Sequence, residues 1–536
     1  MSTDFMALIN GVFTDSHRSI SDLAQGATYQ TILEHDFDTY FVSNLLKKAE
    51  GLDLGVDPTS AALEDFKSFL DEQDRKVIEV QAVLDHIADF PALNRILKHA
   101  RKLIGKFFSD FYVARMQPRF TAGATLTLPR GSSVFARIKA SEGQVTLLHN
   151  LEQLYPGWGE SLCQKIPHTV GTSDWYVSIS TVPKQWNMDR VIGLGPSSAL
   201  AHQCGFADYM VPRLARFCGI DMPTAQEKHK ALAQEHSLDG IMSTQDQRKA
   251  SDNILRILAQ FLLPANVYDY MLAITPTTIE VEGVKRHTHM LCPAGNGYNS
   301  PFQTLLFWAL IKGVQMEVGV DSNVHVYGDD VIVHRDAYDA VCKVFPLLGL
   351  EINQSKSFKE GPFRESCGGD FLYGNNIRAF YAKCIPTTTL EWIKFVNGVR
   401  RVGYYNNAST WRSDNLRRLW FRSILHIPKG ERYFCPRHYG DAGINSECES
   451  LYDIQRGSSR SPDDKSVRYP NNGYDAYGNP YTSERIKIYV ARVGGSRTTF
   501  SEESKRLSQH LVLRTLPSPF LVGAGQRKLR KPDFHG

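Results

Sequence analysis

The sequence predicts an α+β protein in which antiparallel hairpins alternate with helices, and three segments carry this prediction. Residues 324–335, VHVYGDDVIVHR, hold two β-branched runs on either side of Gly-Asp-Asp, which indicates a hairpin with a tight turn. Residues 37–111 have apolar side chains at spacings of three and four, which predicts helices. The run FQTLLFWALIKGV after Pro301 is apolar on nearly every side and predicts a buried helix.

Length and composition indicate a large, folded protein with several lobes. A chain of 536 residues predicts more than one domain, and an aromatic content of 11% argues against disorder. The 61 basic and 57 acidic residues leave a net charge of only +4, so a site for a polyanion must come from local clustering. Nine cysteines without regular spacing favour free thiols in a reducing compartment. The N-terminus lacks the basic flank and apolar core of a signal peptide, and no apolar run reaches the roughly 20 residues of a membrane span, so we expect a soluble protein.

Basic residues recur between residues 115 and 139, where the helical period is lost among Gly, Pro and Thr. They are Arg115, Arg119, Arg130, Arg137 and Lys139. Contact with a phosphate backbone is one interpretation, and a solvated basic loop is the simpler one.

Further on, Lys184 and Arg190 enter a β-branched run after a proline, a spacing that suits two cations holding a triphosphate, with Arg190 as the bidentate partner.

Two aspartates flank the junction between the next extended segment and a helix. Asp246 is predicted at the end of the strand, where neither a cap nor a turn accounts for it. Asp252 is predicted in the first turn of a helix that carries an apolar stripe over residues 254–262 and ends at Pro264, with Ser251 or Asp252 as its cap. Capping alone is the competing explanation for Asp252.

A second hairpin, residues 278–291 with its turn at Glu282-Gly283, leads into a glycine-rich loop, PAGNG, at residues 293–297. The loop is predicted to end where the buried helix begins, with Ser300 as the cap and Pro301 in the first position.

The turn of the 324–335 hairpin carries adjacent carboxylates. Asp329 and Asp330 repel each other, and a fold that tolerates such a pair usually has a cation nearby, for which hard divalent ions such as Mg²⁺ are suited. The competing interpretation is that Gly328 and Asp329 only make the turn.

These motifs together resemble a known family. Two aspartates six residues apart, a Gly-Asn-Gly loop before a buried helix, YGDD, and Lys356-Ser-Phe followed by GPFRESCG at residues 361–368 are similar, in order and spacing, to the replicase catalytic subunit of single-stranded RNA bacteriophages, the leviviruses. The resemblance covers about residues 182–383. It implies an RNA-directed RNA polymerase with the right-hand fold of fingers, palm and thumb, in which an antiparallel palm sheet carries the YGDD hairpin.

The resemblance also implies a division of the chain and a set of residue roles. The predicted segments are a helical N-terminal region that contributes to a bridge between fingers and thumb (1–114), fingers with the triphosphate-binding motif (115–240), a palm with part of the fingers inserted near 265–292 (241–383), and a thumb with a C-terminal region and basic tail (384–536). Asp246 and Asp329, assisted by Asp330, would bind two Mg²⁺ ions, with Mn²⁺ as the alternative ion, and Lys356 would protonate the leaving pyrophosphate. Lys184 and Arg190 would hold the triphosphate, and Asp252 and Asn296 would read the nucleotide's ribose. Gly295 and Gly297, on either side of Asn296, would also bind the nucleotide.

Residues 391–437, in the predicted thumb, hold ten basic and three acidic residues, with aromatic rings among them. The rings are Trp392, Tyr404, Tyr405, Trp411, Trp420 and Phe421. Basic side chains with stacking rings predict contact with RNA, although a helix pair with a solvated face has a similar composition. The candidate RNA-binding residues are Arg400, Arg401, Arg412, Arg417, Arg418 and Arg422.

Cys435 and His438 are spaced like half of a zinc site, but no second pair follows.

The chain departs from the family pattern at Gln245 and Gln247, which stand where apolar residues are usual, and at Pro293, which replaces a hydroxyl residue. No departure removes a predicted metal ligand. Two alternatives stay open. A reverse transcriptase would share the palm, but Asp252 suits acceptance of a ribose better than its exclusion. An RNA-binding subunit without catalysis predicts loss of the carboxylates, and all are present.

The resemblance implies the partners and the location as well. We expect a single-stranded RNA template with its nascent RNA, ribonucleoside triphosphates, and host translation elongation factors Tu and Ts with a ribosomal RNA-binding protein. The expected location is the cytoplasm of an infected bacterial host, with no membrane involved.

Overall fold

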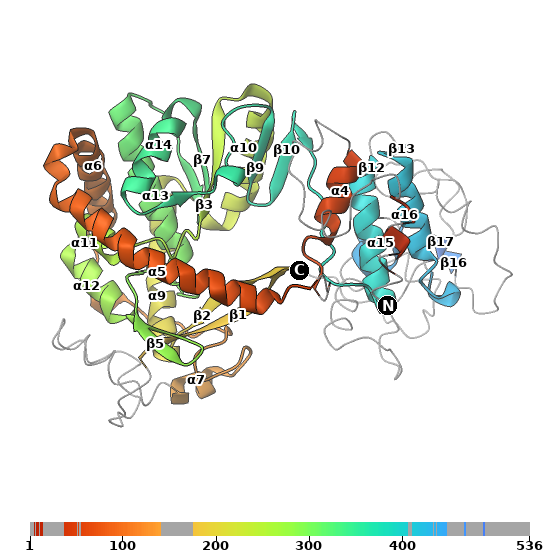
Figure 1. Cartoon of the computed structure of the whole chain (residues 1–536), viewed down its shortest axis with the longest axis horizontal. Coiled ribbons are helices and arrows are strands. Elements are labelled where there is room, and N and C mark those ends of the chain that lie inside the picture. Colours follow the sequence, from red (N-terminus) through yellow and green to blue (C-terminus); the bar gives the residue numbers. More distant parts are fainter. Residues whose placement is uncertain are drawn as a thin grey trace. The chain divides into compact units, whose positions relative to one another are not determined.

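The computed structural model describes two compact units of the chain (Figure 1). The described residues are 5, 7–9, 11–13, 37–50, 52, 55–140, 175–405, 410–432, 434–435, 437–446, 466–467 and 486–487. Unit 1 combines Met1–Leu54 with Ala379–Gly536, and unit 2 is Gly55–Arg378. The finer division into four segments stays a prediction.

Unit 2 is built around one long buried helix, α13 (Asn299–Val318). Its side chains from Pro301 to Ile311 are all buried, which agrees with the apolar run seen in the sequence. Gly313 of α13 lets the helix approach α6, because a Cβ there would lie 2.6 Å from the carbonyl oxygen of Ile96. The other described helices of unit 2 are α5 (Pro58–Asp85), α6 (Pro91–Phe107), α7 (Val134–Ala140), α9 (Ser197–Arg213), α10 (Met222–Asp239), α11 (Arg256–Leu262), α12 (Ala265–Ala273) and α14 (Arg335–Leu347), with short helical turns at Ile87–Asp89, Val113–Arg115, Leu214–Cys218 and Gln354–Lys356.

The first sheet of unit 2 has the strand order β2-β1-β4-β5, so β2 lies at its edge. Its strands are β1 (Val177–Gln185), β2 (Met188–Leu194), β4 (Thr278–Val281) and β5 (Val284–His287). The β1–β2 and β4–β5 pairs are antiparallel hairpins, and β1 pairs with β4 in parallel. The predicted turn of the β4–β5 hairpin is confirmed, since Glu282 and Gly283 both have positive φ, as a two-residue hairpin turn of this kind requires.

The second sheet has the order β6-β7-β3-β8 and is antiparallel throughout. Its strands are β3 (Met242–Arg248), β6 (His325–Tyr327), β7 (Asp330–His334) and β8 (Glu351–Ile352). The β6–β7 pair confirms the predicted hairpin, and the central residues of β7 are fully buried against α13 and its neighbours. A smaller antiparallel sheet, β11-β10-β9, follows, with β9 (Phe363–Ser366), β10 (Gly369–Leu372) and β11 (Asn375–Asn376). The buried Arg364 joins it to β3, because its Nε donates to the carbonyl of Met242 at 2.8 Å.

Helix α5 connects the two large sheets of unit 2. Figure 1 shows it as one long helix that runs across the front of the unit toward β1 and β2. At its start, Thr59 donates to Asp189 of β2 at 2.8 Å. Further along, Asp71 and Asp74 pair with Arg286 of β5, while Lys76 pairs with Glu351 of β8. Through the hydrogen bond to β2 and the ion pairs to β5 and β8, α5 fixes the first sheet against the second.

In the described part of unit 1, helices pack around aromatic side chains. These helices are α4 (Phe37–Leu46), α15 (Thr389–Gly403) and α16 (Asp414–Ile424), with helical turns at Lys429–Glu431 and Arg437–Ala442. Its short strands are β12 (Tyr404–Tyr405), β13 (Thr410–Trp411), β14 (Phe434–Cys435), β15 (Ile444–Asn445), β16 (Ser466–Val467) and β17 (Ile486–Lys487). Helix α15 begins with a full capping box, in which Thr388 and Glu391 each bond the other's backbone. Trp420 of α16 is completely buried.

The mixed helix and antiparallel-sheet class predicted from the sequence is confirmed, but three local predictions were wrong. Residues 134–140 form α7, in a stretch where we saw no helical period. Helix α11 begins at Arg256, not near Asp252, so neither Ser251 nor Asp252 caps it. Helix α13 begins at Asn299 without a side-chain cap, two residues before the predicted start.

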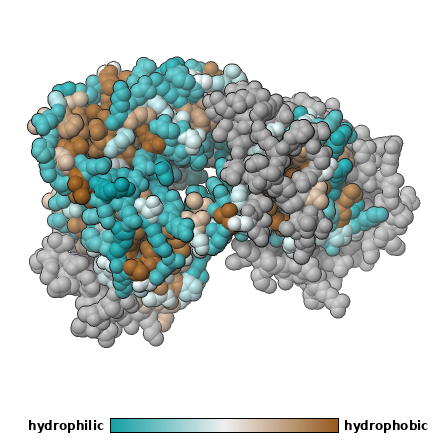
Figure 2. Space-filling model, in the orientation of Figure 1, coloured by the Kyte–Doolittle hydropathy of each residue, from teal (hydrophilic) through white to brown (hydrophobic). Residues whose placement is uncertain are grey.

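Two further expectations concern cysteines and membranes. The six cysteines whose side chains the structure describes are free thiols, as predicted. None of the described helices combines the length and the apolar character needed to cross a bilayer. Figure 2 shows that the visible face of unit 2 is mainly hydrophilic, with separate hydrophobic groups between. The side chains of Cys435 and His438, and the basic tail, lie outside the described residues.

Candidate active site

Three carboxylates lie at or beside the turn of the β6–β7 hairpin. Asp246 of β3 lies opposite Asp330 of β7, and Asp329 directly precedes Asp330. Burial raises the pKa of Asp246 and Asp329 adds to the rise, while Lys356 and Asn353 oppose it. Burial, with the charges of Asp329 and Asp246, raises the pKa of Asp330 to about 6. We call Asp246, Asp329 and Asp330 the carboxylate cluster.

Polar neighbours fix the orientation of Asp246. Asn353 donates twice to it at 2.8 Å, from its backbone N–H to the Asp246 carbonyl and from Nδ2 to Oδ2. The backbone N–H of Asp246 donates to Ser357 Oγ at 3.1 Å. The backbone N–H, the backbone carbonyl and one carboxylate oxygen of Asp246 are all hydrogen-bonded. The carboxylate is therefore held in one orientation at the position where the pairing of β3 with β7 ends.

Lys356 lies beside the carboxylate cluster, in the helical turn after β8. Its Nζ is 3.9 Å from Oδ2 of Asp246, and half of the side chain is exposed. Burial opposes its charge, but the carboxylates of Asp246, Glu365, Asp330 and Asp329 together raise the pKa of Lys356. The lysine is therefore held as a cation that carries a proton next to the cluster.

Lys184 and Arg190 lie on the two strands of the β1–β2 hairpin. Arg190 pairs with Val182, and the register shifts between Val182 and Gln185, so Lys184 sits at an irregularity of β1. Partial desolvation, then the charges of Arg190 and Lys356, lower the pKa of Lys184, while Asp246 and Asp329 act in the opposite direction. Lys184 and Arg190 therefore lie close enough to interact, and Lys184 also interacts with Asp246 and Asp329 of the carboxylate cluster.

Asp252 contacts the glycine-rich loop, residues 293–297, instead of capping a helix. Its Oδ1 accepts from the backbone N–H of Ala294 at 2.8 Å. Burial raises the pKa of Asp252 to about 6, and the Ala294 N–H opposes that rise. Asn296 sits at the middle of the loop, where its Nδ2 donates to the hydroxyl of Tyr298 at 3.4 Å. Gly297 donates its backbone N–H to Gln203 Oε1 at 3.1 Å.

Glu365 of β9 is a fourth carboxylate near the cluster that the sequence did not single out. It lies opposite Asp370 in the β9–β10 pair, and Arg378 Nη1 is 3.8 Å from its Oε1. Burial and Asp370 raise the pKa of Glu365 to about 7, while Lys356 and Arg378 oppose the rise. The signal that could have found it is its place within the GPFRESCG segment.

The donor set of the carboxylate cluster suits a hard divalent cation. Within the described residues, no group of three or more His, Cys, Asp or Glu side chains lies close enough together to hold a metal by itself. Magnesium sites in phosphate-handling enzymes commonly use one or two carboxylates together with substrate phosphates. Asp246 and Asp329 fit that smaller requirement, because Asp329 is close enough to raise the pKa of Asp246, and both carboxylates act to raise the pKa of Lys184.

The six candidate RNA-binding arginines belong to unit 1, and they differ in exposure and in the contacts that they make. Arg400 is buried and stacks over Tyr404 at 4.1 Å, and Arg412 lies over Phe37 at 4.9 Å, so both have structural contacts. Arg422 is exposed but donates to the carbonyl of Gly11. The remaining three, Arg401, Arg417 and Arg418, are exposed.

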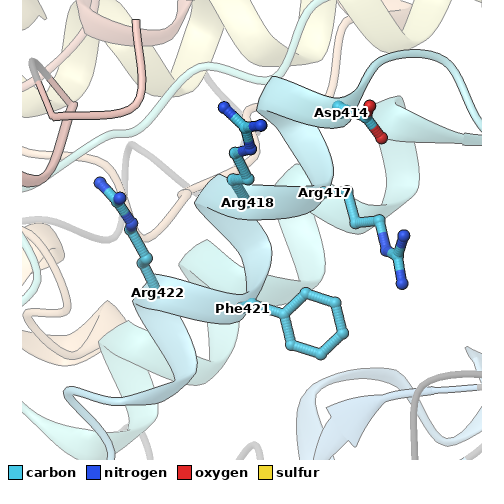
Figure 3. A pocket seen from close by; sticks show the side chains of 5 residues that line it. All are labelled: Asp414, Arg417, Arg418, Phe421 and Arg422. Atoms are coloured by element: carbon cyan, nitrogen blue, oxygen red, sulfur yellow. The ribbon is translucent and has the colours of Figure 1, made fainter. Parts of the chain in front are cut away.

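The rings that were expected to stack on RNA bases are mostly part of the core of unit 1. Trp392, Tyr404 and Trp420 are buried, which contradicts that part of the prediction. Phe421 is half-buried and, with Arg417, Arg418, Arg422 and Asp414, lines a pocket on α16. Figure 3 shows Arg418 and Arg422 projecting from one side of the helix and Phe421 and Arg417 from the other.

Sequence comparison relates the chain to RNA phage proteins. A family model described as "RNA replicase, beta-chain" matches residues 13–510. The "RNA-directed RNA polymerase beta chain" of Enterobacteria phage GA is 32% identical over 220 residues, which is 41% of each chain. The protein of the same name from Escherichia phage MS2 is 30% identical over 47% of this chain and 45% of the relative. The chain thus spans less than half the length of these two relatives. The "RNA-directed RNA polymerase subunit beta" of Enterobacteria phage SP is 29% identical over 77% of this chain and 72% of its own.

Structure comparison finds weaker likeness. The RNA-dependent RNA polymerase of a human picorbirnavirus has a TM-score of 0.38 at 12% identity, covering 73% of this chain and 90% of its own. A chain described as "RdRp complex" has a TM-score of 0.39 at 11% identity, covering 73% of this chain and 36% of its own. At these TM-scores the likeness supports no conclusion about fold or function.

Proposed function

Because the chain belongs to the RNA replicase beta-chain family, we propose that it copies an RNA template into RNA from ribonucleoside triphosphates, replicating the genome of a single-stranded RNA phage. The observation that carries this proposal is the meeting of the carboxylate cluster with Lys184, Arg190 and Lys356 in unit 2. Nucleotidyl transfer needs charge neutralisation at the phosphates and a positioned proton donor, and these residue types supply both.

In this proposal the carboxylate cluster holds two Mg²⁺ ions, or Mn²⁺, through Asp246 and Asp329, with Asp330 assisting. When bound, such ions activate the attacking 3′-hydroxyl and stabilise the leaving pyrophosphate. Asn353 keeps the Asp246 carboxylate oriented toward the turn. Lys184 and Arg190 hold the triphosphate, and Lys356 donates a proton to the pyrophosphate. Asp252 and Asn296, in contact with the loop that Gly295 and Gly297 shape, read the ribose hydroxyl.

We assign unit 2 to the palm and fingers of a right-hand polymerase, and the helices of unit 1 to its thumb. The β3 sheet with the YGDD hairpin would be the palm sheet, and the β1–β2 and β4–β5 hairpins would belong to the fingers. Host elongation factors Tu and Ts, and a ribosomal RNA-binding protein, are proposed partners in the bacterial cytoplasm. Comparing the purified chain with and without host extract tests whether they are required.

The first prediction concerns catalysis itself. Asp329→Asn should keep the fold and abolish primer-independent incorporation of labelled ribonucleotides on a single-stranded RNA, because it removes a ligand from the main site of charge stabilisation. Asp321→Asn, an exposed aspartate just before β6, is the matched control and should incorporate normally. Incorporation by Asp329→Asn within a few-fold of wild type would contradict the proposed metal site. A wild-type chain that binds RNA but incorporates nothing, even with host extract, would point to a subunit without catalysis.

Lys356 should act as a proton donor and not only as a charge. Replacing it with Leu should slow single-turnover incorporation by about 10² to 10⁴ with little change in nucleotide affinity. Lys356→Arg keeps the charge but holds its proton too tightly to donate it, so it should stay slow. The control is Lys359→Leu, three residues on, where the side chain pairs with Asp339 instead. Recovery of the full rate in Lys356→Arg would show that charge attraction alone explains the residue.

The exposed arginines of α16 are proposed to contact the RNA backbone. Replacing Arg417 and Arg418 together with Gln should weaken RNA binding for all sequences alike. The slope of log affinity against log salt concentration should also fall by the amount expected for the loss of about two phosphate contacts. Filter binding over a series of salt concentrations measures both effects. The control replaces Lys394 and Lys429, two exposed cations of the same unit. An equal loss in the control would mean that the RNA senses only the overall charge of unit 1.

A further inference from the structure

The glycine-rich loop is bonded on two sides through a single residue, Ala294. Its backbone N–H donates to the carboxylate of Asp252 at 2.8 Å. Its carbonyl accepts from the backbone N–H of Gly193 at 2.7 Å. Gly193 lies in β2, three residues after Arg190, at the free edge of the first sheet. Ala294 therefore links the segment after β3 to the hairpin that carries Lys184 and Arg190.

The loop and β2 approach so closely that side chains are excluded at the contact. A Cβ on Gly193 would lie 2.6 Å from the carbonyl oxygen of Ala294 and 2.5 Å from Val177 Cγ1. A Cβ on Gly295, which has a φ of +106°, would lie 2.2 Å from the carbonyl oxygen of Gly193. Backbone thus packs on backbone from both sides, and the loop cannot rest on β2 in this way if either glycine is replaced.

The far end of the loop is fixed as well. Gly297 donates to Gln203 of α9 at 3.1 Å, and Gln203 donates in turn to the carbonyl of Ile274 at 2.9 Å. Asn296, between these two anchors, is therefore held at a set distance from β2. Displacing the Ala294 end would move Asn296 relative to Arg190.

We infer that the Gly193–Ala294 contact is a positioning contact that sets the distance between the triphosphate-binding hairpin and the ribose-reading residues. This inference rests on the proposed function, and it adds Gly193 as a positioning residue that touches no nucleotide itself. Because phosphate and ribose are parts of one molecule, a nucleotide can engage Arg190 and Asn296 together only if their separation is fixed. The contact makes recognition of the two groups interdependent.

The test is Gly193→Ala, assayed for UTP and dUTP incorporation. The added methyl should push the loop away from β2 and so raise KM for UTP about tenfold to 10²-fold, with a smaller effect on kcat, because no reacting group is touched. The ratio of UTP to dUTP efficiency should narrow in the same variant, since Asn296 and Asp252 lose their alignment with the ribose. A merely structural role would lower the amount of active enzyme without moving KM or the ratio.

Two further variants make the result specific. Gly195→Ala makes the same substitution just beyond the end of β2, where the nearest atom to the new Cβ is Val177 Cγ2 at 4.0 Å, and it should behave as wild type. Val177→Ala combined with Gly193→Ala removes the clash with Val177 and keeps the one with Ala294, so the defect should persist. This double variant also keeps the test available if the single variant does not fold.

The inference is overturned if Gly193→Ala matches Gly195→Ala in KM and in the UTP to dUTP ratio, or if the double variant recovers wild-type values. Failure of the proposed function is distinguishable, because it would appear as a wild-type chain and a Gly195→Ala variant that both incorporate no nucleotide.

Discussion

Antiparallel pairing of β3 with β7 places Asp246 opposite Asp330, with Asp329 one residue earlier in the turn, so that three carboxylates share one edge of a sheet. Like charges opposite one another destabilise a sheet. The register is nevertheless imposed by the apolar residues of β6 and β7, such as Val326, Val331 and Val333, which are completely buried against α13. Burial of the apolar face of these strands thus fixes a register that brings the carboxylates near one another on the opposite face. The surrounding cations offset part of the repulsion, and they are the residues that a triphosphate and its metal ions would use.

The elements around this edge are joined mainly through backbone. Asn353 bonds the carbonyl of Asp246, Gly193 bonds Ala294, and the N–H of Ala294 bonds Asp252. Backbone contacts of this kind do not depend on the rotamers of long side chains, so they hold spacing more tightly than ion pairs would. The exposed cations, Lys184 and Lys356, keep their freedom to follow a ligand. Rigid spacing with adjustable charges is what a site needs if it is to accept four different nucleotides and reject the wrong sugar.

Local patterns predicted a good part of this fold, and long-range contacts account for the errors. The β6–β7 hairpin and α13 were evident because alternation and an unbroken apolar run are local signals. Asp252 was misplaced because a helix cap and a partner for the Ala294 N–H require the same residue type, and only the tertiary contact decides between them. Gly193 had no signal in the sequence, and Glu365 had only its place within the GPFRESCG segment, because each gains its role from a close backbone approach or a strand register.

The basic stretch of unit 1 shows that composition alone does not identify an RNA-binding surface. Interleaved arginines and rings suggested an RNA surface, yet Arg400 and the rings Tyr404 and Trp420 pack on one another inside the unit. Of the six candidate arginines, only the exposed ones remain candidates for RNA contact. In unit 2 the departures Gln245 and Gln247 flank Asp246 and are buried, with Gln245 directed at Cys342 of α14. They therefore lie on the helix-packed side of β3, away from the carboxylate cluster.

Binding of a divalent cation by the carboxylate cluster is the property on which the proposed chemistry most directly depends. Mn²⁺ titrated into the purified chain and followed by electron paramagnetic resonance reports this without any need for turnover. We predict binding by the wild type and by Asp321→Asn, and an affinity at least about tenfold lower for Asp246→Asn, since even loss of a group that supports a metal ligand costs this much. Equal Mn²⁺ affinity in Asp246→Asn and wild type would contradict the account.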